Sequence, residues 1–230
     1  MRKLTRNTII GGSVAVAALG LTALPAAAAP TSVTITAAGS SGSSVAISGI
    51  NSGNVTAKDT STGAAITCTK GTASGTSKLG TGLPLTAVAS VTSVSLSSPA
   101  NAGGWCSGPA GLTIQVTANT STPWTLDVTG VTSGGVTAGK LNGVKASIVG
   151  SDNCHATVTA NGVVNGPGGF VTGSYNNTTH ALTTGGTGTT SNLKVATVDA
   201  NCDPTLINAG DSVSLNGTFV ITPALVVNAT

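Results

Sequence analysis

Several short stretches of the chain alternate between hydrophobic and polar residues with a period of two, which is typical of β-strands that bury one face. The clearest stretches are residues 112–118, 124–128, 156–160 and 212–222. In the last of them one parity holds Val213, Leu215, Gly217, Phe219 and Ile221, and polar residues dominate the other. Helical spacing of apolar residues is nearly absent. The pattern therefore predicts a protein built of strands.

Turn-forming clusters rich in Gly, Asn and Asp separate the strand-like stretches, namely "KDTSTG", "LNG", "ANG", "YNNTT" and "NAGD". Such clusters favour tight turns between antiparallel neighbours. Strands that recur about every 8 to 12 residues without helices between them predict an antiparallel β-sandwich, with a closed β-barrel as the alternative. We expect one all-β domain over residues 29–230, in which the Gly/Ser/Thr-rich segments 36–44 and 183–191 are loops.

Large aromatic side chains are scarce, so the core should consist of many Val, Ala, Leu and Ile side chains. The aromatic residues are Trp105, Trp124, Phe170, Tyr175 and Phe219.

Residues 1–28 have the features of a signal peptide for general secretion. Arg2, Lys3 and Arg6 form a basic start, an apolar run follows, and small alanines precede the expected cut after Ala28. No paired arginines precede the apolar run and no cysteine follows it before Cys68, which argues against twin-arginine export and a lipid anchor. The rest of the chain lacks an apolar run of about 18 residues, so no transmembrane helix is expected in the mature protein.

Removal of the signal peptide changes the charge of the protein. The net charge of +3 comes entirely from the basic start, because the remainder holds six lysines and six aspartates. That remainder has no arginine and no glutamate. Bidentate phosphate contacts and basic stripes are therefore absent, and a nucleic-acid partner is not expected.

The four cysteines predict a disulfide framework. Cys68, Cys154 and Cys202 each share parity with neighbouring apolar residues, so their side chains should face the core. An even number of such cysteines in an exported protein favours disulfides, and four cysteines permit three connectivities. We expect Cys68–Cys106 and Cys154–Cys202, each of which closes a loop of roughly 40 to 50 residues.

The stretch "SDNCHATVTANG" (151–162) places Asp152, Cys154 and His155 within four positions and raises the question of a reactive centre. Adjacent residues on a strand point to opposite faces, so Cys154 should face the core while His155, Thr157 and Thr159 face water. This geometry argues against a Cys–His nucleophile and against zinc held by the neighbours. We expect no catalytic residues and no metal.

Other motifs match known sites only in part. "GGVTAGKL" (134–141) lacks the Ser or Thr and the helix of a phosphate-binding loop, and a hairpin turn is the expected structure. "GWCSG" (104–108) lacks the helix of a nucleophile elbow. "LPLTA" (83–87) has no sorting tail behind it. Asp199, Asn201 and Asp203 resemble the start of a calcium loop, but Pro204 and Gly210 break the pattern.

Several phrases in order resemble a group of short exported actinobacterial all-β proteins without an assigned function. The phrases are "KDTSTGAAITC", "PWTLDV", "CHATVTANG", "GSYNNTTHAL" and "GDSVSLNGTFVITPA", and they cover most of the mature chain. The resemblance implies an extracellular, disulfide-bonded, all-β protein and supplies no catalytic residues.

These observations favour a non-catalytic secreted or cell-envelope protein that acts in adhesion, in a matrix or in ligand binding, without a cofactor. Trp105 and Trp124 are the candidate ligand-binding residues, and a cell-surface or extracellular glycan is a candidate partner. One alternative is a small β-barrel carrier or an outer-envelope barrel. A further alternative is a secreted hydrolase that uses an aspartate with His155 or His180.

Overall fold

Antiparallel strands make up most of the computed structural model, which describes residues 29–186 and 188–230. Within this part of the chain the helical segments are two short 3-10 turns, Ala102–Gly104 and Pro109–Gly111. Nowhere in these residues is there a helix long and apolar enough to cross a membrane. The expected signal peptide, residues 1–28, lies outside the described residues.

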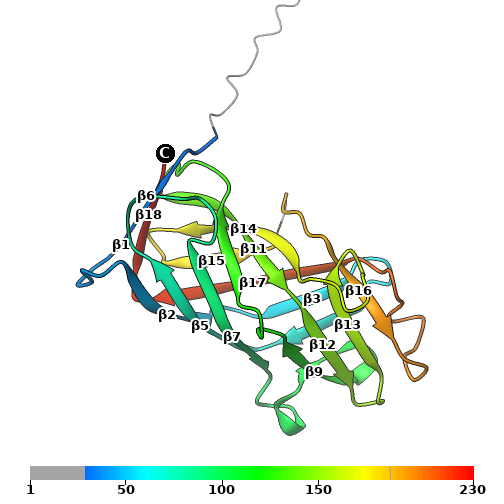
Figure 1. Ribbon diagram of the computed structural model, residues 1–230. Coiled ribbons are helices and arrows are strands. Elements are labelled where there is room, and N and C mark those ends of the chain that lie inside the picture. Colours follow the sequence, from blue (N-terminus) through cyan, green and yellow to red (C-terminus); the bar gives the residue numbers. More distant parts are fainter. Residues whose placement is uncertain (1–28, 187) are drawn as a thin grey trace, which may run out of the picture.

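Eight strands close into an antiparallel barrel (Figure 1). In order around the barrel they are β15 (Ala181–Thr184), β14 (Gly169–Asn176), β11 (Val136–Val144), β10 (Trp124–Val128), β7 (Ala89–Ser97), β5 (Lys70–Lys78), β2 (Ser44–Asn51) and β17 (Val213–Thr222). Pairing of β15 with β17 closes the ring. The all-β, disulfide-bonded fold is thus confirmed, and of the two architectures considered the closed barrel is the one observed.

Closure requires the strands to bend, and a glycine in β5 shows how the sequence permits this. The register between β5 and β7 shifts between Ser74 and Gly75. A Cβ at Gly75 would lie 1.9 Å from the carbonyl oxygen of Ser90. Only glycine allows this close approach of the two backbones, and the irregularity lets the strand curve.

A second sheet continues from the barrel through β17. Its other strands are, in order, β3 (Val55–Asp59), β4 (Ala65–Cys68), β8 (Cys106–Ser107), β9 (Thr113–Ala118), β12 (Ala146–Gly150), β13 (His155–Ala160) and β16 (Leu193–Val198). The first half of β17 pairs with β3 and the second half with β2 and β15. A bridge between Lys194 and Ser212 brings β16 back to the start of β17, so this sheet also curls round on itself.

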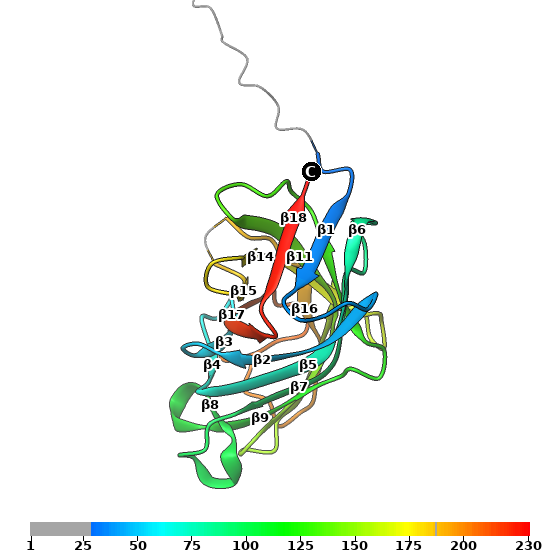
Figure 2. The same cartoon turned by 90° about the vertical axis from the view of Figure 1, so that its left-hand side faces the viewer.

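A three-stranded sheet of β18 (Leu225–Ala229), β1 (Val33–Ala37) and β6 (Gly80–Leu83) packs against one end of the barrel (Figure 2). Alternate residues of β1 and β18 are buried and belong to the same apolar cluster as Val128, Tyr175 and Ile221 of the barrel. The intervening residues Thr36 and Val226 are exposed. This sheet therefore fills the end of the barrel with its apolar face.

Polar side chains cover the outer backbone edge of β18. The Tyr175 hydroxyl donates to the Leu225 carbonyl at 3.0 Å and accepts from the Leu225 N–H at 3.3 Å. Asn177 binds the carbonyl and the N–H of Val227 at 2.8 and 2.9 Å. The N–H of Ala229 donates to Thr132 at 2.8 Å. Side chains thus take the place of a neighbouring strand, and the edge is not free to pair with another chain.

Replacing Tyr175 with Phe is expected to lower the free energy of unfolding by about 1–3 kcal/mol, because the buried N–H and carbonyl of Leu225 lose their partner. Burial raises the pKa of Tyr175 above 10.0, although the hydrogen bond with Leu225 opposes this. The neutral hydroxyl therefore stabilises the fold below pH 10, and this contribution disappears as the pH rises through the folded-state pKa.

Urea unfolding of both proteins between neutral and alkaline pH tests this expectation. The difference in stability between wild type and Tyr175→Phe should shrink above pH 10. Tyr175 is the only tyrosine, so tyrosinate absorbance reports its ionisation directly. A difference that stays constant across this pH range would contradict the assigned role.

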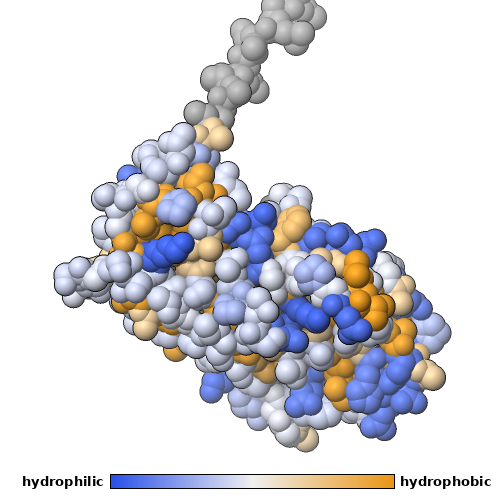
Figure 3. Space-filling view, in the orientation of Figure 1, coloured by the Kyte–Doolittle hydropathy of each residue, from blue (hydrophilic) through white to orange (hydrophobic). Residues whose placement is uncertain are grey.

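The outer face of the barrel is polar but carries little charge. Outward positions on β5 and β7 hold Thr72, Ser74, Thr76, Ser93 and Ser95, all of which retain solvent exposure. In Figure 3 the surface is mostly pale, and apolar residues form separate small patches. On these two strands the solvent-facing surface of the barrel thus consists mainly of hydroxyl side chains and not of charged ones.

Two local predictions were wrong, and each has its own physical cause. The sequence "LNG" (141–143) is not a turn but part of β11, where the pairing with β14 shifts between Asn142 and Val144. Thr159, expected to face water, is 1% exposed and donates to the Val163 carbonyl. The alternation of β13 itself is intact, because Ala156, Val158 and Ala160 are all buried and the shift in register against β16 falls at Ala196 of β16. Thr159 is buried on the other face, where the chain after β13 folds back and brings the Val163 carbonyl to its hydroxyl.

Candidate functional site

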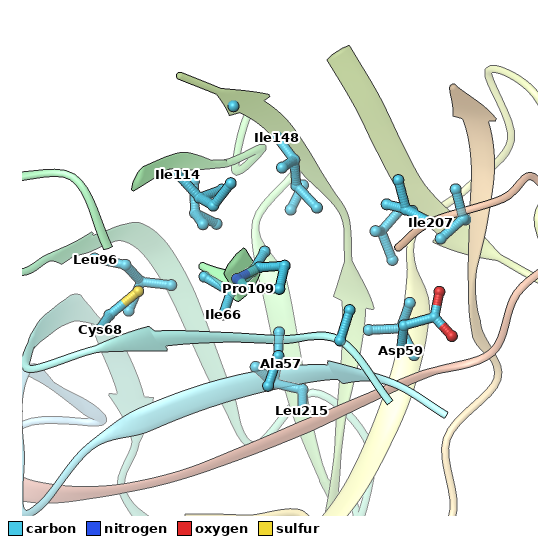
Figure 4. Close-up of a pocket in the computed structure, with 18 of the residues that line it drawn as sticks. Ala57, Asp59, Ile66, Cys68, Leu96, Pro109, Ile114, Ile148, Ile207 and Leu215 are labelled. Atoms are coloured by element: carbon cyan, nitrogen blue, oxygen red, sulfur yellow. The ribbon is translucent and has the colours of Figure 1, made fainter. Parts of the chain in front are cut away.

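The second sheet encloses an apolar cavity of about 140 Å³ (Figure 4). Its walls come from inward positions on many strands, among them Ala57 on β3, Ile66 on β4, Ile114 on β9, Ile148 on β12 and Leu215 on β17. These positions follow the period-two pattern, but many are Ala or Val, and Trp124 is the only aromatic side chain among them. Short side chains around a wide ring of strands leave the space open.

Both disulfides lie at this cavity. Cys68 is bonded to Cys106 and Cys154 to Cys202, as expected from the sequence. Cys68 and Cys154 line the cavity. The first bond joins β4 to β8 within the cavity wall, and the second ties β13 to the loop 199–212, so both hold segments that are distant in the sequence.

The two tryptophans lie in different settings. Trp124 is buried at 5% exposure, lines the cavity, and donates its indole N–H to the Asn119 carbonyl at 2.9 Å. Trp105 is half-buried in the loop after β7 and is not among the cavity residues. Its indole packs over Gly103, where an added Cβ would lie 3.2 Å from the ring. Of the two candidate residues, Trp124 alone contributes to this cavity, and the glycan partner stays a prediction.

Loops from four connections meet at one end of the cavity. The lining includes residues from these loops, which are segments 60–64, 108–112, 151–153 and 199–212. Leu206 and Ile207 place apolar side chains over the interior, and the Thr62 hydroxyl donates to the Leu206 carbonyl at 2.8 Å. We call this end the mouth of the cavity.

Acidic side chains gather at the mouth. Asp59, Asp152 and Asp203 line the cavity, and Asp199 and Asp211 lie on the same loop as Asp203. They are five of the six aspartates in the described chain, the other being Asp127 on β10. Among the described residues, none of them is within ion-pair distance of a lysine.

Asp59 is the most buried of these acids, at 7% exposure. Its Oδ1 accepts the N–H groups of Ser61 and Thr62 at 2.8 and 3.0 Å and so stabilises the turn after β3. Its Oδ2 is buried and accepts no N–H or hydroxyl group of the described residues, and the Asp59 side chain forms a hydrogen bond with that of Asp211. Asp59 was not among the candidate residues identified from the sequence. The signal was present, since Asp59 shares parity with Val55 and Ala57 on an inward-facing strand.

Local hydrogen bonds keep the neighbouring carboxylates ionised. Burial by itself would raise the pKa of Asp211, but hydrogen bonds with Ser61, Asn208 and the Asp59 side chain outweigh it, so the pKa is lowered. The pKa of Asp203 is lowered by the backbone N–H and the hydroxyl of Thr205. The mouth therefore carries negative charge at neutral pH.

His155 lies outside the cavity and pairs with Asp199. The imidazole Nδ1 and the Asp199 carboxylate are 2.7 Å apart, and the side chains are 59% and 37% exposed. The pKa of Asp199 is lowered, because hydrogen bonds from His155 and the Asn201 N–H outweigh partial desolvation. Asp199 is the side chain that His155 contacts by a hydrogen bond among the described residues.

The stretch 151–162 is thus the start of a disulfide-bonded strand. Cys154 is 8% exposed and faces inward, while His155 faces solvent, as its parity predicts. The sulfurs of Cys154 and Cys202 lie within 4.8 Å of an Asp199 oxygen, but both are oxidised in the disulfide and offer no thiolate to a metal.

The remaining candidate residues have local roles. Asp199 and Asp203, which resemble calcium ligands in the sequence, accept the backbone N–H groups of Asn201 and Thr205 in tight turns. His180 lies at the turn between β14 and β15 with φ of 54°, and its buried Nδ1 has no hydrogen-bond partner within residues 29–186 and 188–230. The structure does not bring His180 together with the cavity residues.

Comparison with protein-family models, with curated proteins and with solved structures found no match to the chain.

Proposed function

We propose that the protein is a secreted, non-catalytic binding protein that holds a small apolar ligand in the cavity of the second sheet. The observation that carries this proposal is the cavity itself, which is enclosed by apolar side chains and has a volume of about 140 Å³. Dry apolar cavities of about 150 Å³ bind molecules of the size of benzene or xenon. The cavity therefore supports the ligand-binding role suggested by the sequence.

Features of the chain support action outside the cell. Disulfides such as Cys68–Cys106 and Cys154–Cys202 persist in oxidising compartments. The N-terminal sequence has the basic, apolar and small-residue regions of a signal peptide.

Filling the cavity tests the proposal. Ala57 faces the interior between Ile66 and Leu215, so Ala57→Ile should occupy the space without a polar change. Benzene at about 100 times its Kd should stabilise the wild type by about 2.7 kcal/mol, because it binds only the folded state, and should not stabilise Ala57→Ile. Thermal unfolding with and without benzene measures both.

Ala46→Ile is the matched control, because Ala46 is exposed on β2 of the barrel and is not among the cavity residues. This variant should respond to benzene as the wild type does. In a Trp105→Phe background Trp124 is the only tryptophan, so its fluorescence reports occupancy directly. Equal stabilisation of Ala57→Ile and wild type, or no response of either, would refute the proposal.

A further inference from the structure

The connection between β13 and β14, residues 161–168, holds two large apolar side chains in water. Val163 and Val164 are 52% and 58% exposed, and among the exposed large apolar residues of the described chain they alone are neighbours in sequence. The connection reads "NGVVNGPG" and contains no charged residue. Adjoining exposed apolar side chains indicate contact with a partner more strongly than single ones do. We call this connection the valine loop.

Hydrogen bonds fix the shape of the valine loop. The Thr159 hydroxyl donates to the Val163 carbonyl at 2.9 Å, and the Gly166 N–H donates to the same carbonyl at 2.9 Å. Where the loop leaves β13, the Val163 N–H donates to the Ala160 carbonyl, and the Ala160 N–H donates to the Pro167 carbonyl, both at 3.1 Å. The loop therefore has a defined conformation that displays the two valine side chains on the surface.

Two lysines flank the valine loop. The Lys145 ammonium group donates to the Gly166 carbonyl at 3.3 Å. Lys194 lies opposite Thr159 in the pairing of β13 with β16, and a Cβ added at Gly162 would lie 3.3 Å from the Lys194 Cβ. Residues directly opposite in an antiparallel pair share one face. Lys194 is therefore on the face of the sheet over which the valine loop folds.

Both lysines keep their positive charge available to a partner. In the part of the chain that the structure describes, neither lies within ion-pair distance of a carboxylate. Asp211, which lies beside the bridge from β16 to β17, turns its carboxylate to the Asn208 N–H at 2.8 Å. Segment 151–153, which belongs to the mouth of the cavity, is at the opposite end of β13 from the valine loop. The surface of the valine loop thus combines apolar side chains with positive charge.

We infer that the valine loop, with Lys145 and Lys194, docks the protein on the surface of an anionic lipid membrane. Lysines beside apolar residues suit this surface, because their methylene stems lie along the apolar layer while their ammonium groups contact the headgroups. A soluble polyanion would attract the lysines but leave Val163 and Val164 in water, so the combination favours a membrane. The inference does not depend on a ligand in the cavity.

Co-sedimentation with lipid vesicles tests the inference. It uses residues 29–230, which contain the whole barrel and both disulfides, so that the apolar run of the expected signal peptide does not contribute. At low salt, vesicles of equal parts phosphatidylglycerol and phosphatidylcholine should bind the protein at least about tenfold more strongly than vesicles of phosphatidylcholine alone, and added salt should reduce the difference. Equal binding to both, or binding to neither, would overturn the inference.

Replacing the two lysines separates their contribution from that of the valines. Lys145→Gln combined with Lys194→Gln should weaken binding to the mixed vesicles at least about tenfold, since each lysine near an anionic surface contributes about fivefold. Val163→Ser combined with Val164→Ser should weaken it at least about fivefold through lost apolar contact. Should the loss of the Lys145 hydrogen bond disturb the fold, Lys194→Gln alone should still weaken binding about fivefold.

Matched controls are Lys70→Gln on β5 and Val226→Ser on β18, because both residues are exposed and lie outside the valine loop. These variants should bind the mixed vesicles as the wild type does. Ala57→Ile should do the same, which separates this inference from the proposed cavity function. If the controls lose as much binding as the loop variants, the valine loop is not the docking surface.

Methyl NMR in bicelles of the same lipids locates the contact. A nitroxide-labelled lipid should broaden the methyl signals of Val163 and Val164 and leave that of Val226 unchanged. Broadening at Val226 alone would place the contact elsewhere and overturn the inference. Binding to soluble polyphosphate without binding to vesicles would identify an acidic polymer as the partner and would overturn it as well.

Discussion

Replacing Cys154 and Cys202 together with alanine is expected to lower the free energy of unfolding by about 4 kcal/mol, as estimated from loop-closure entropy. The bond spans 48 residues of sequence, so without it the unfolded chain gains many conformations. The change also releases the loop that holds Leu206 and Ile207 at the mouth, so binding of an apolar ligand should weaken as well. Urea unfolding under non-reducing conditions measures the stability.

His155→Ala is the control for this double replacement. His155 adjoins Cys154 but is exposed, and its removal should change the stability by no more than about 0.5 kcal/mol. A loss of less than about 1 kcal/mol in the cysteine variant would mean that the disulfide contributes little to the fold.

Ile35→Ala is expected to lower the free energy of unfolding by about 2–5 kcal/mol. Ile35 is 2% exposed and lies in the apolar cluster between the three-stranded sheet and the barrel. Truncation removes buried surface and leaves a cavity that the surrounding closed strands cannot collapse to fill. Thermal and urea unfolding should both show the loss.

Thr36→Ala, one residue further along β1, is the matched control. Thr36 is exposed on the opposite face of the sheet, so its replacement should cost less than about 0.5 kcal/mol. If the two variants lose similar amounts of stability, the sheet of β1, β6 and β18 does not close the barrel as an apolar layer.

The period-two pattern predicted the strands well, because it reports directly which face of a strand is buried. It placed Cys154 inside and His155 outside. It left three pairings of the four cysteines open, and the expected pairs, Cys68–Cys106 and Cys154–Cys202, are the ones that the structure has, although Cys202 lies in the loop after β16 and not on a strand. The pattern does not report which strands are neighbours. Closure depends on β17 pairing with β15, β2 and β3 at once, and nothing in the alternation of residues 212–222 encodes those partners.

The alternation failed in two places. It reports which face of a strand points inward but not what covers the other face, and Thr159 is buried where the chain folds back and brings the Val163 carbonyl to its hydroxyl. "LNG" has the composition of a turn, yet it lies within the long strand β11. Gly143, whose φ is 81°, is the residue at which the register of β11 against β14 shifts. Composition alone cannot distinguish these two uses of glycine, because both require the same backbone conformation.

The cavity could be predicted only in part. Trp124 was a candidate from its residue type, and it does line the cavity. The cavity itself arises from the sum of many short side chains around a curled sheet, which no single stretch of sequence reveals. Asp59 could have been found, since an aspartate at an inward position of "VTAKD" conflicts with the apolar face that Val55 and Ala57 define.

Methyl NMR with benzene tests most directly whether the second sheet encloses a binding site. The methyl groups of Ile66, Ile114 and Ile148 line that cavity, whereas Ile35 lines a separate cavity of about 70 Å³ in the barrel, which is too small for benzene. We expect saturable shifts of the first three methyl signals, nuclear Overhauser contacts from them to benzene, and no change at Ile35. Shifts confined to surface residues, or equal shifts at all four isoleucines, would contradict the account.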